Sequence, residues 1–208
     1  RYALRRSANV SSHDFVVDRE ARERLNGHKG RVVWLTGLSG SGKSTIADAA
    51  ERDLHAQGVR TFVIDGDNVR HGPNKDLGFT AEDRAENVRR VAEVGRLMVQ
   101  AGTVVLIALV SPFRGDRRAA RDLFDLGDFV EVFVNTPVEV CTARDPKGLY
   151  AKAASGELRN LSGVGQEYEE PLNPDLVVAG DGDLAQSVAA VVALATAPAP
   201  VAPASEEE

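Results

Sequence analysis

The chain has 208 residues, of which 43% are hydrophobic and 27% are charged, and its formal net charge is −6. This length and composition predict one globular domain with a full core. The negative net charge argues against bulk attraction to nucleic acid or to an anionic membrane. The single cysteine, Cys141, leaves no partner for an internal disulfide and suits a reducing cytoplasm. The longest apolar run, residues 103–110, is too short to span a bilayer.

The two ends of the chain differ in character from its middle. The first 27 residues show little apolar periodicity, so we expect an arm or linker with a short helix over 18–25, capped by Asp18. Residues 195–208 are rich in Ala and Pro and then acidic, a composition that predicts disorder. The main domain is therefore expected to span residues 28–194.

Within this domain, apolar runs bounded by glycine or proline predict strands, and helical apolar spacing predicts helices. We expect strands at 31–36, 61–64, 103–109, 129–134 and 176–178, and helices at 43–57, 81–101, 116–124, from 137, and at 184–194. Thr80 is the expected N-cap of the long helix, with Asp83 completing a capping box. Residues 145–173 lack a strand pattern, which predicts an active-site lid.

The alternation of strands and helices predicts an α/β fold. We expect a doubly wound sheet of five parallel strands between two helical layers, with the lid added. Ligands of such sheets bind beyond the carboxyl ends of the strands. Three polar segments fall there, at 37–44, 65–70 and 111–114. The functional site is therefore expected at that edge of the sheet.

The first of these segments has the Walker A pattern G-x-x-x-x-G-K-S, and it lies between an expected strand and an expected helix. It reads Gly37-Leu38-Ser39-Gly40-Ser41-Gly42-Lys43-Ser44. Its glycines allow backbone N–H groups to surround an anion, and the following helix N-terminus adds positive potential. Lys43 would reach the β- and γ-phosphates, and the Ser44 hydroxyl would be a ligand of Mg²⁺. The alternative is a plain glycine-rich turn, but the pattern in this context predicts a nucleoside triphosphate site in a three-layer fold like that of P-loop kinases.

Charged residues follow the second strand, opposite the expected phosphate loop. Asp65 stands where a carboxylate could orient an acceptor hydroxyl or hold a metal-bound water. A turn at the Asp-Gly pair is the alternative, and Asp67 could cap a short helix. Arg70, Arg84 and Asn87 could face the same cleft and hold an anionic group. For the arginines, the alternative is an exposed salt bridge with Glu82, Glu86 or Glu93.

Several blocks together resemble the adenylylsulfate kinase family. Besides the Walker A segment they are Asp65-Gly66-Asp67-Asn68-Val69-Arg70-His71-Gly72, Asp76-Leu77-Gly78-Phe79, Asp83-Arg84-x-Glu86-Asn87-x-Arg89-Arg90, Ser111-Pro112-Phe113-Arg114 and Asp145-Pro146-Lys147-Gly148-Leu149-Tyr150. The blocks come in the family's order. The resemblance implies ATP-dependent phosphorylation of the 3′-hydroxyl of adenosine 5′-phosphosulfate (APS), which gives 3′-phosphoadenylyl sulfate in sulfate activation.

The resemblance also implies roles for individual residues. The chemistry would fall to Lys43, Asp65, Ser111 and Lys147. ATP would be bound by Gly37, Leu38, Ser39, Gly40, Ser41, Gly42, Lys43, Ser44, Thr45 and Arg144, with Mg²⁺ on Ser44. APS would be bound by Asp65, Arg70, Phe79, Arg84, Asn87, Ser111 and Lys147. Phe79 offers a flat face on which adenine can stack.

Two of these residues have alternative roles. Ser111 corresponds to a serine often described as a phosphoenzyme intermediate. We expect instead a hydrogen-bonding contact to substrate, because no base is evident beside Ser111 and in-line transfer needs only positioning and charge neutralisation. For Lys147 the alternative to a role in the lid is a structural salt bridge with Asp145.

The resemblance extends to partners. It implies a cytoplasmic homodimer, and residues 2–10 resemble the join to a GTP-dependent sulfate adenylyltransferase subunit in bifunctional proteins. Pro73 departs from the leucine usual in the family. Two other functions stay open: a P-loop kinase of another hydroxyl-bearing metabolite, and a nucleotide-binding regulatory module without turnover. A GTPase is not supported, since the sequence has no Asn-Lys-x-Asp motif, and the third strand ends without a Walker B acid.

Overall fold

The computed structural model describes residue 13 and residues 15–198; the expected N-terminal arm before residue 13 and residues 199–208 of the expected tail lie outside this part of the chain. The described chain forms one parallel sheet with the strand order β2-β3-β1-β4-β5. The strands are β1 (Arg31–Thr36), β2 (Thr61–Asp65), β3 (Val104–Ala108), β4 (Phe129–Asn135) and β5 (Leu176–Ala179). The expected α/β fold of five parallel strands is confirmed.

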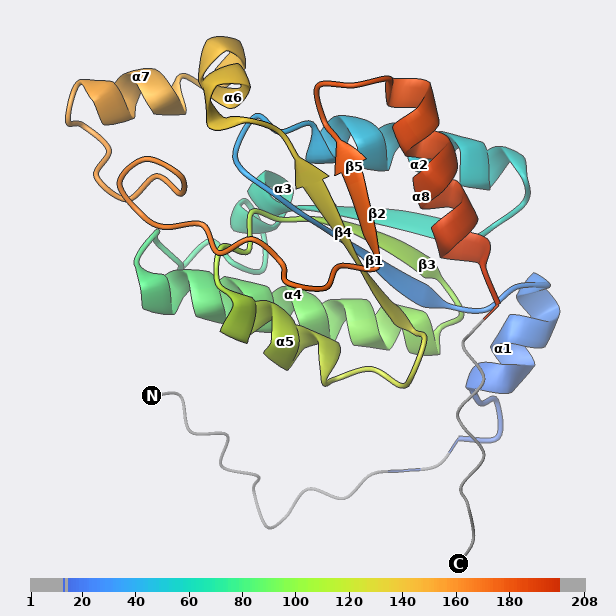
Figure 1. Cartoon of the computed structure of the whole chain (residues 1–208). Coiled ribbons are helices and arrows are strands. Elements are labelled where there is room, and N and C mark those ends of the chain that lie inside the picture. Colours follow the sequence, from blue (N-terminus) through green and yellow to red (C-terminus); the bar gives the residue numbers. More distant parts are fainter. Residues whose placement is uncertain (1–12, 14, 199–208) are drawn as a thin grey trace, which may run out of the picture.

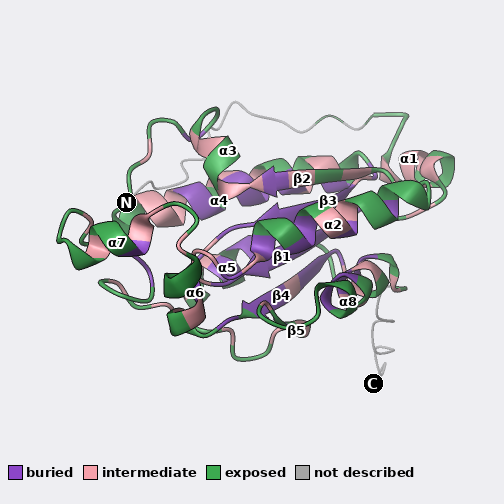
Figure 2. Cartoon of the chain, turned by 90° about the horizontal axis from the view of Figure 1, so that it is seen from above, coloured by how far each residue is buried: buried purple, intermediate pink, exposed green. Residues whose placement is uncertain are grey.

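Helices cover both faces of this sheet (Figure 1). On one face lie α2 (Lys43–Ala56) and α8 (Leu184–Thr196), and on the other lie α4 (Ala81–Gln100) and α5 (Arg114–Arg121). The remaining helices are α1 (Arg19–Asn26), α3 (Gly66–Arg70), α6 (Val138–Arg144) and α7 (Leu149–Ala154). Seen from above, α7 and α1 lie at opposite ends of the molecule (Figure 2). None of the described helices is long and apolar enough to cross a membrane.

The central strand β1 is buried over its whole length, which fits its apolar sequence. Because successive strand side chains point to opposite faces, Val33 and Leu35 enter the core under α2 and α8, whereas Val32 and Trp34 enter the core over α4. These two clusters hold the sheet between its helical layers. The strand ends that carry polar residues are thereby fixed in space.

Local capping explains where several helices begin. The Asp18 carboxylate accepts a hydrogen bond from the backbone N–H of Ala21 at 2.7 Å, and the Thr80 hydroxyl accepts one from Asp83 at 3.2 Å. Both expected N-caps are confirmed. The cap of α3 is Asp65, which accepts from the N–H of Asp67 at 2.9 Å, so the alternative that Asp67 caps this helix is wrong.

Some boundaries differ from the expected ones. Helix α5 begins at Arg114 rather than 116, where the backbone N–H of Arg114 donates to Glu169 Oε2 at 2.7 Å. The last helix continues to Thr196, because Ala195 is buried in the core, so the expected tail starts too early. The expected lid contains helix α7, whose first N–H groups bind the carboxylate of Asp145. The early start of α5 could not be predicted from local sequence, because Glu169 lies 55 positions from Arg114 in the chain.

Candidate active site

The phosphate loop, residues 37–44, joins β1 to α2 in the conformation that its glycines permit. Gly37 has φ 154°, and a Cβ there would lie 2.6 Å from the carbonyl oxygen of Val134. Gly42 has φ 103°, is the N-cap residue of α2, and has no side chain to bind the first-turn N–H groups. Those donors are open to an external anion, and the helix dipole favours negative charge at the same place.

Lys43 lies across this loop and is only 7% exposed. Its ammonium donates to the carbonyl oxygens of Gly37 at 3.0 Å and Leu38 at 2.7 Å, and to the Ser41 hydroxyl at 3.3 Å. Burial, with the nearby charge of Lys147 as a lesser cause, lowers the pKa of Lys43 to about 8. A buried cation without a carboxylate in contact is a site that an anionic ligand would stabilise.

Ser44 and Asp65 meet where β1 and β2 deliver their loops. The Ser44 hydroxyl donates to Asp65 Oδ2 at 2.6 Å, so the expected Mg²⁺ ligand and the expected carboxylate lie together. The described residues contain no cluster of three or more His, Cys, Asp or Glu side chains suited to a metal ion. The pair of Ser44 and Asp65 fits an ion that arrives on the phosphates of a nucleotide and keeps several waters, as Mg²⁺ does.

A cavity of about 580 Å³ opens over the phosphate loop. Its wall includes Lys43, Ser44, Thr45 and Asp65, and Arg144 from the end of α6. The Arg144 guanidinium donates to the carbonyl oxygens of Gly40 at 3.3 Å and Gly180 at 3.0 Å. Of the residues expected to bind ATP, the structure thus brings Arg144 to the phosphate loop from a distant part of the chain.

A second cavity of about 560 Å³ lies beside the first, between α3, α4 and the segment around α7. Six of the seven residues expected to bind APS line it, namely Arg70, Phe79, Arg84, Asn87, Ser111 and Lys147, whereas the seventh, Asp65, lines only the first cavity. The Phe79 ring is half exposed, with the guanidinium carbon of Arg70 at 4.4 Å from its centroid and that of Arg84 at 5.6 Å. The aromatic face and the two cations therefore form one surface.

Within the described residues, neither Arg70 nor Arg84 forms an ion pair with a carboxylate, although Asp67 and Asp83 lie near enough to Arg70 to act on its charge. Both donate to backbone carbonyls, Arg70 to Leu77 and Gly78 and Arg84 to Phe79 and Asn160. Burial lowers the pKa of both groups, and the charge of Arg70 lowers that of Arg84 further. The salt-bridge alternative instead describes Arg89 and Arg90, which both bind Glu86.

Asn87 is buried in the wall of this second cavity, at 6% exposure. Its Oδ1 accepts a hydrogen bond from Nδ2 of Asn74 at 2.9 Å, and Asn74 is itself 1% exposed. An amide whose oxygen is occupied presents its NH₂ group to other partners. Asn74 therefore turns the donor end of Asn87 toward the cavity.

The two cavities share one wall, made by Ser39, Gly66, Asp67, Val110 and Lys147. Lys147, between α6 and α7, forms an ion pair with Asp67 of α3 across this junction. The alternative pairing of Lys147 with Asp145 is not what forms, because the Asp145 carboxylate binds the N–H groups at the start of α7. Lys147 thus lies where the contents of the two cavities would meet.

Comparison with known proteins agrees with this geometry. The model of the family described as adenylylsulphate kinase matches residues 29–179. The chain belongs to this family.

Relatives and solved structures support the assignment. The adenylyl-sulfate kinase of Erwinia tasmaniensis is 58% identical over 173 residues, which cover 83% of this chain and 86% of that protein. The bifunctional enzyme NodQ of Rhizobium meliloti is 55% identical over 175 residues, which cover 84% of this chain and 27% of that enzyme. The structure of the Mycobacterium tuberculosis APS kinase in complex with AMPPNP and APS matches with a TM-score of 0.77 and 45% identity, covering 80% of this chain and 98% of that one.

In this adenylylsulphate kinase, Ser111 lies in the wall of the second cavity, and its hydroxyl group already binds two other residues of the protein. Ser111 Oγ donates to Thr36 Oγ1 at 2.9 Å and accepts from the indole N–H of Trp34 at 3.1 Å. Thr36 Oγ1 donates in turn to the carbonyl of Val110 at 2.8 Å. The single hydroxyl proton of Ser111 is therefore already used, so this serine can accept one more hydrogen bond but cannot donate one.

Two features of the kinase were not expected from its sequence. For Asp67 the sequence predicts only a possible helix cap, although its place in the Asp65-Gly66-Asp67 block puts it beside the phosphate loop. The buried polar residues behind Ser111, above all Arg117 and Tyr168, come from α5 and from the chain after α7. Only their contacts reveal this cluster, because local sequence does not show which distant groups Arg117 and Tyr168 bind.

Proposed function

We propose that this kinase transfers the γ-phosphoryl group of ATP to the 3′-hydroxyl of APS and so produces 3′-phosphoadenylyl sulfate. The observation that carries this proposal is the presence of two cavities of similar volume that meet at Asp67 and Lys147. One cavity contains a phosphate loop, and the other contains two arginines and an aromatic face. Such a pair suits two anionic nucleotides whose reacting ends meet at the junction.

The donor side would bind the triphosphate through the phosphate loop. The open N–H groups at the start of α2 and the ammonium of Lys43 would bind the β- and γ-phosphates. Phosphate oxygens would replace the loop carbonyls as partners of Lys43, which explains why a lysine is buried there at all. Arg144, beside Gly40 and Gly180, would neutralise charge or contact the base at the edge of this cavity.

The acceptor side would bind APS through charge, stacking and one amide. Arg70 and Arg84 offer planar donors to phosphosulfate oxygens. Phe79 would stack with the adenine, and the buried NH₂ group of Asn87 would donate to an acceptor atom of the nucleotide. The Arg84 contact to Asn160 links this side to the chain that follows α7.

Transfer would occur at the shared wall, where positioning and charge neutralisation supply most of the catalysis. Asp65 would orient the attacking hydroxyl, and Lys147 would leave Asp67 to stabilise charge on the transferred group. Ser44 and Asp65 would hold Mg²⁺, which when bound would neutralise phosphate charge. Ser111 would accept a hydrogen bond from APS and would not carry a phosphoryl group.

The test is ADP release measured with ATP and each of three acceptors: APS, gluconate and shikimate. We expect turnover with APS alone, and formation of 3′-phosphoadenylyl sulfate identified by mass spectrometry. Turnover with another acceptor but not APS would refute the acceptor assignment. Binding of ATP and APS without turnover would instead favour a regulatory module. Chelation of divalent cations should stop turnover, and added Mg²⁺ should restore it.

The assembly and location also belong to this proposal. We expect a homodimer in the cytoplasm, and a sulfate adenylyltransferase subunit as fused or bound partner. Light scattering of the purified chain tests the dimer. The similarity to bifunctional NodQ supports the fusion, since such an enzyme contains a region like this chain within a longer protein.

A further inference from the structure

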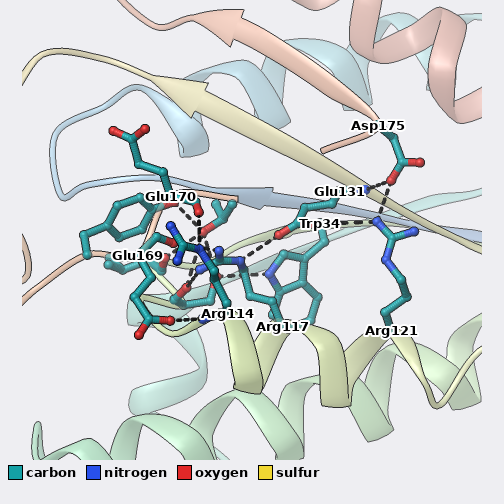
Figure 3. Close-up of polar contacts among 12 residues, drawn as sticks. Trp34, Arg114, Arg117, Arg121, Glu131, Glu169, Glu170 and Asp175 are labelled. Atoms are coloured by element: carbon teal, nitrogen blue, oxygen red, sulfur yellow. Dashed lines mark hydrogen bonds and ion pairs between the residues drawn. The ribbon is translucent and has the colours of Figure 1, made fainter. Parts of the chain in front are cut away.

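The buried polar cluster behind Ser111 connects three parts of the chain that the reaction would use. Figure 3 shows it between β1, β4 and α5. It comprises Trp34 and Thr36 of β1, Ser111 after β3, Arg117 of α5, Glu131 of β4, and Tyr168 and Glu169 from the chain between α7 and β5. We refer to this set as the Arg117 cluster.

Arg117 is the centre of this cluster and is only 3% exposed. Its Nε donates to Glu131 Oε1, its Nη1 to the carbonyl oxygen of Ser111, and its Nη2 to the carbonyl oxygen of Glu169, each at 2.7 Å. A guanidinium is the side chain that can make three such bonds in fixed directions. One side chain thus ties β4, the loop after β3 and the chain that returns from the lid region.

The loop after β3 needs such support because Ser111 is strained. Its φ of 39° lies in the left-handed region, where residues other than glycine are uncommon. Such a conformation persists only where the surroundings over-determine it. Here Arg117 holds the Ser111 carbonyl, while Trp34 and Thr36 hold its hydroxyl. Ser111, Leu109, Val110 and Pro112 all line the second cavity, so this strained loop shapes the acceptor side.

A second line of contacts reaches the same loop from the returning chain. The Tyr168 hydroxyl lies 2.9 Å from Thr36 Oγ1, whose own proton is used by Val110, so Tyr168 is the donor. The N–H of Glu169 donates to the carbonyl of Pro112 at 2.9 Å. Glu169 therefore binds the loop after β3 directly, Tyr168 binds it through Thr36, and Arg117 binds both the loop and Glu169.

We propose that Arg117 is a positioning residue that couples the chain after α7 to the acceptor cavity by holding Ser111 in its strained conformation. The inference rests on the proposed function for its substrate, APS. Arg117 itself touches neither cavity. Its effect would be transmitted through the carbonyl of Ser111, so it should act on APS and leave ATP binding unchanged.

The experiment compares Arg117→Lys with Arg121→Lys, a matched control one helical turn further along α5. Arg121 also binds carboxylates, Asp175 at 2.6 Å and Glu131 at 3.8 Å, but it does not contact Ser111 or residues 168–169. We expect Arg117→Lys to raise KM for APS roughly 10-fold, since misplacement of a contact by about 1 Å can cost far more than that in rate. KM for ATP should stay unchanged in both variants, and thermal unfolding should show what each substitution does to stability alone.

A readout independent of turnover is available because Trp34 is the only tryptophan in the sequence. Its indole N–H binds Ser111, so its emission should shift in Arg117→Lys and not in Arg121→Lys. An unchanged emission together with an unchanged KM for APS would overturn the proposal. If the wild-type chain does not turn over APS, the proposed function fails, and the emission difference alone then decides whether Arg117 positions Ser111.

Tyr168→Phe provides a second variant in case Arg117→Lys does not fold. It keeps the ring, which stacks on Phe133 at 6.1 Å, and removes only the hydroxyl that binds Thr36. A rise of several-fold in KM for APS, with KM for ATP and the unfolding temperature unchanged, would support the coupling. An unchanged KM for APS in every folded variant would overturn it.

Discussion

Replacing Lys43 by methionine should abolish phosphoryl transfer and yet stabilise the free protein. Lys43 is buried in the phosphate loop, where its pKa falls from the usual 10.5 to about 8. That difference of about 2.5 corresponds to about 3 kcal/mol, because each pKa unit is worth about 1.4 kcal/mol. The charged ammonium therefore destabilises the free protein by about this amount at neutral pH.

The pH dependence gives this prediction its sign. Near pH 7 Lys43 is charged in both the folded and the unfolded chain, so the buried ammonium lowers the stability of the folded protein by its full amount. Above pH 8 the folded form loses the proton first, and stability of the wild type rises with pH until the unfolded lysine also titrates near 10.5. The stability advantage of Lys43→Met should therefore shrink by about 2 kcal/mol between about pH 7 and about pH 9.5.

Urea unfolding of both proteins across this pH range measures the difference, since all other titrating groups are common to both. A difference that does not vary with pH would show that Lys43 is not buried and charged in the free protein, and would refute the reasoning. Adding ATP gives an internal control. ATP should stabilise the wild type by mass action and leave Lys43→Met almost unaffected.

Three further predictions concern the acceptor side. Ser111→Ala should reduce kcat by no more than roughly 10-fold, and the wild type incubated with ATP should show no phosphorylated species in intact-protein mass spectra, since direct transfer needs no covalent intermediate; a loss near that of Lys43→Met, or a phosphorylated wild type, would contradict this. Asn74→Asp should rotate the Asn87 amide so that its oxygen faces the cavity, which should raise KM for APS roughly 10-fold. Asn74→Ser should raise KM for APS less, and initial rates at varied APS concentration measure both. Arg84→Gln should raise KM for APS roughly 10-fold or more with KM for ATP unchanged, whereas equal changes in both would argue that Arg84 acts on the fold.

Much of the site was predictable because local sequence and fold class constrain it. The Walker A segment needs glycine at positions such as Gly37 and Gly42, and a parallel sheet brings the ends of β1 and β2 together. The meeting of Ser44 with Asp65 follows from these two facts. Asp18 and Thr80 cap their helices through groups only three residues away, so local sequence suffices there as well.

Other features depend on contacts between residues far apart in the chain. Lys147 pairs with Asp67 rather than with its neighbour Asp145, because Asp145 is taken by the N–H groups of α7. Asn74 orients Asn87 from a loop with no helical or strand pattern of its own.

The sequence by itself determined the fold class, the phosphate loop and the residue types that line each cavity, because those depend on short-range pattern and on the geometry of parallel sheets. Tertiary structure alone decided which partner each buried polar group takes. Ser111 shows the reason: its hydroxyl proton can go to only one acceptor, and Thr36, 75 residues away in sequence, is that acceptor. Hydrogen bonds of this kind depend on distances of a few tenths of an ångström, which only the packed chain defines.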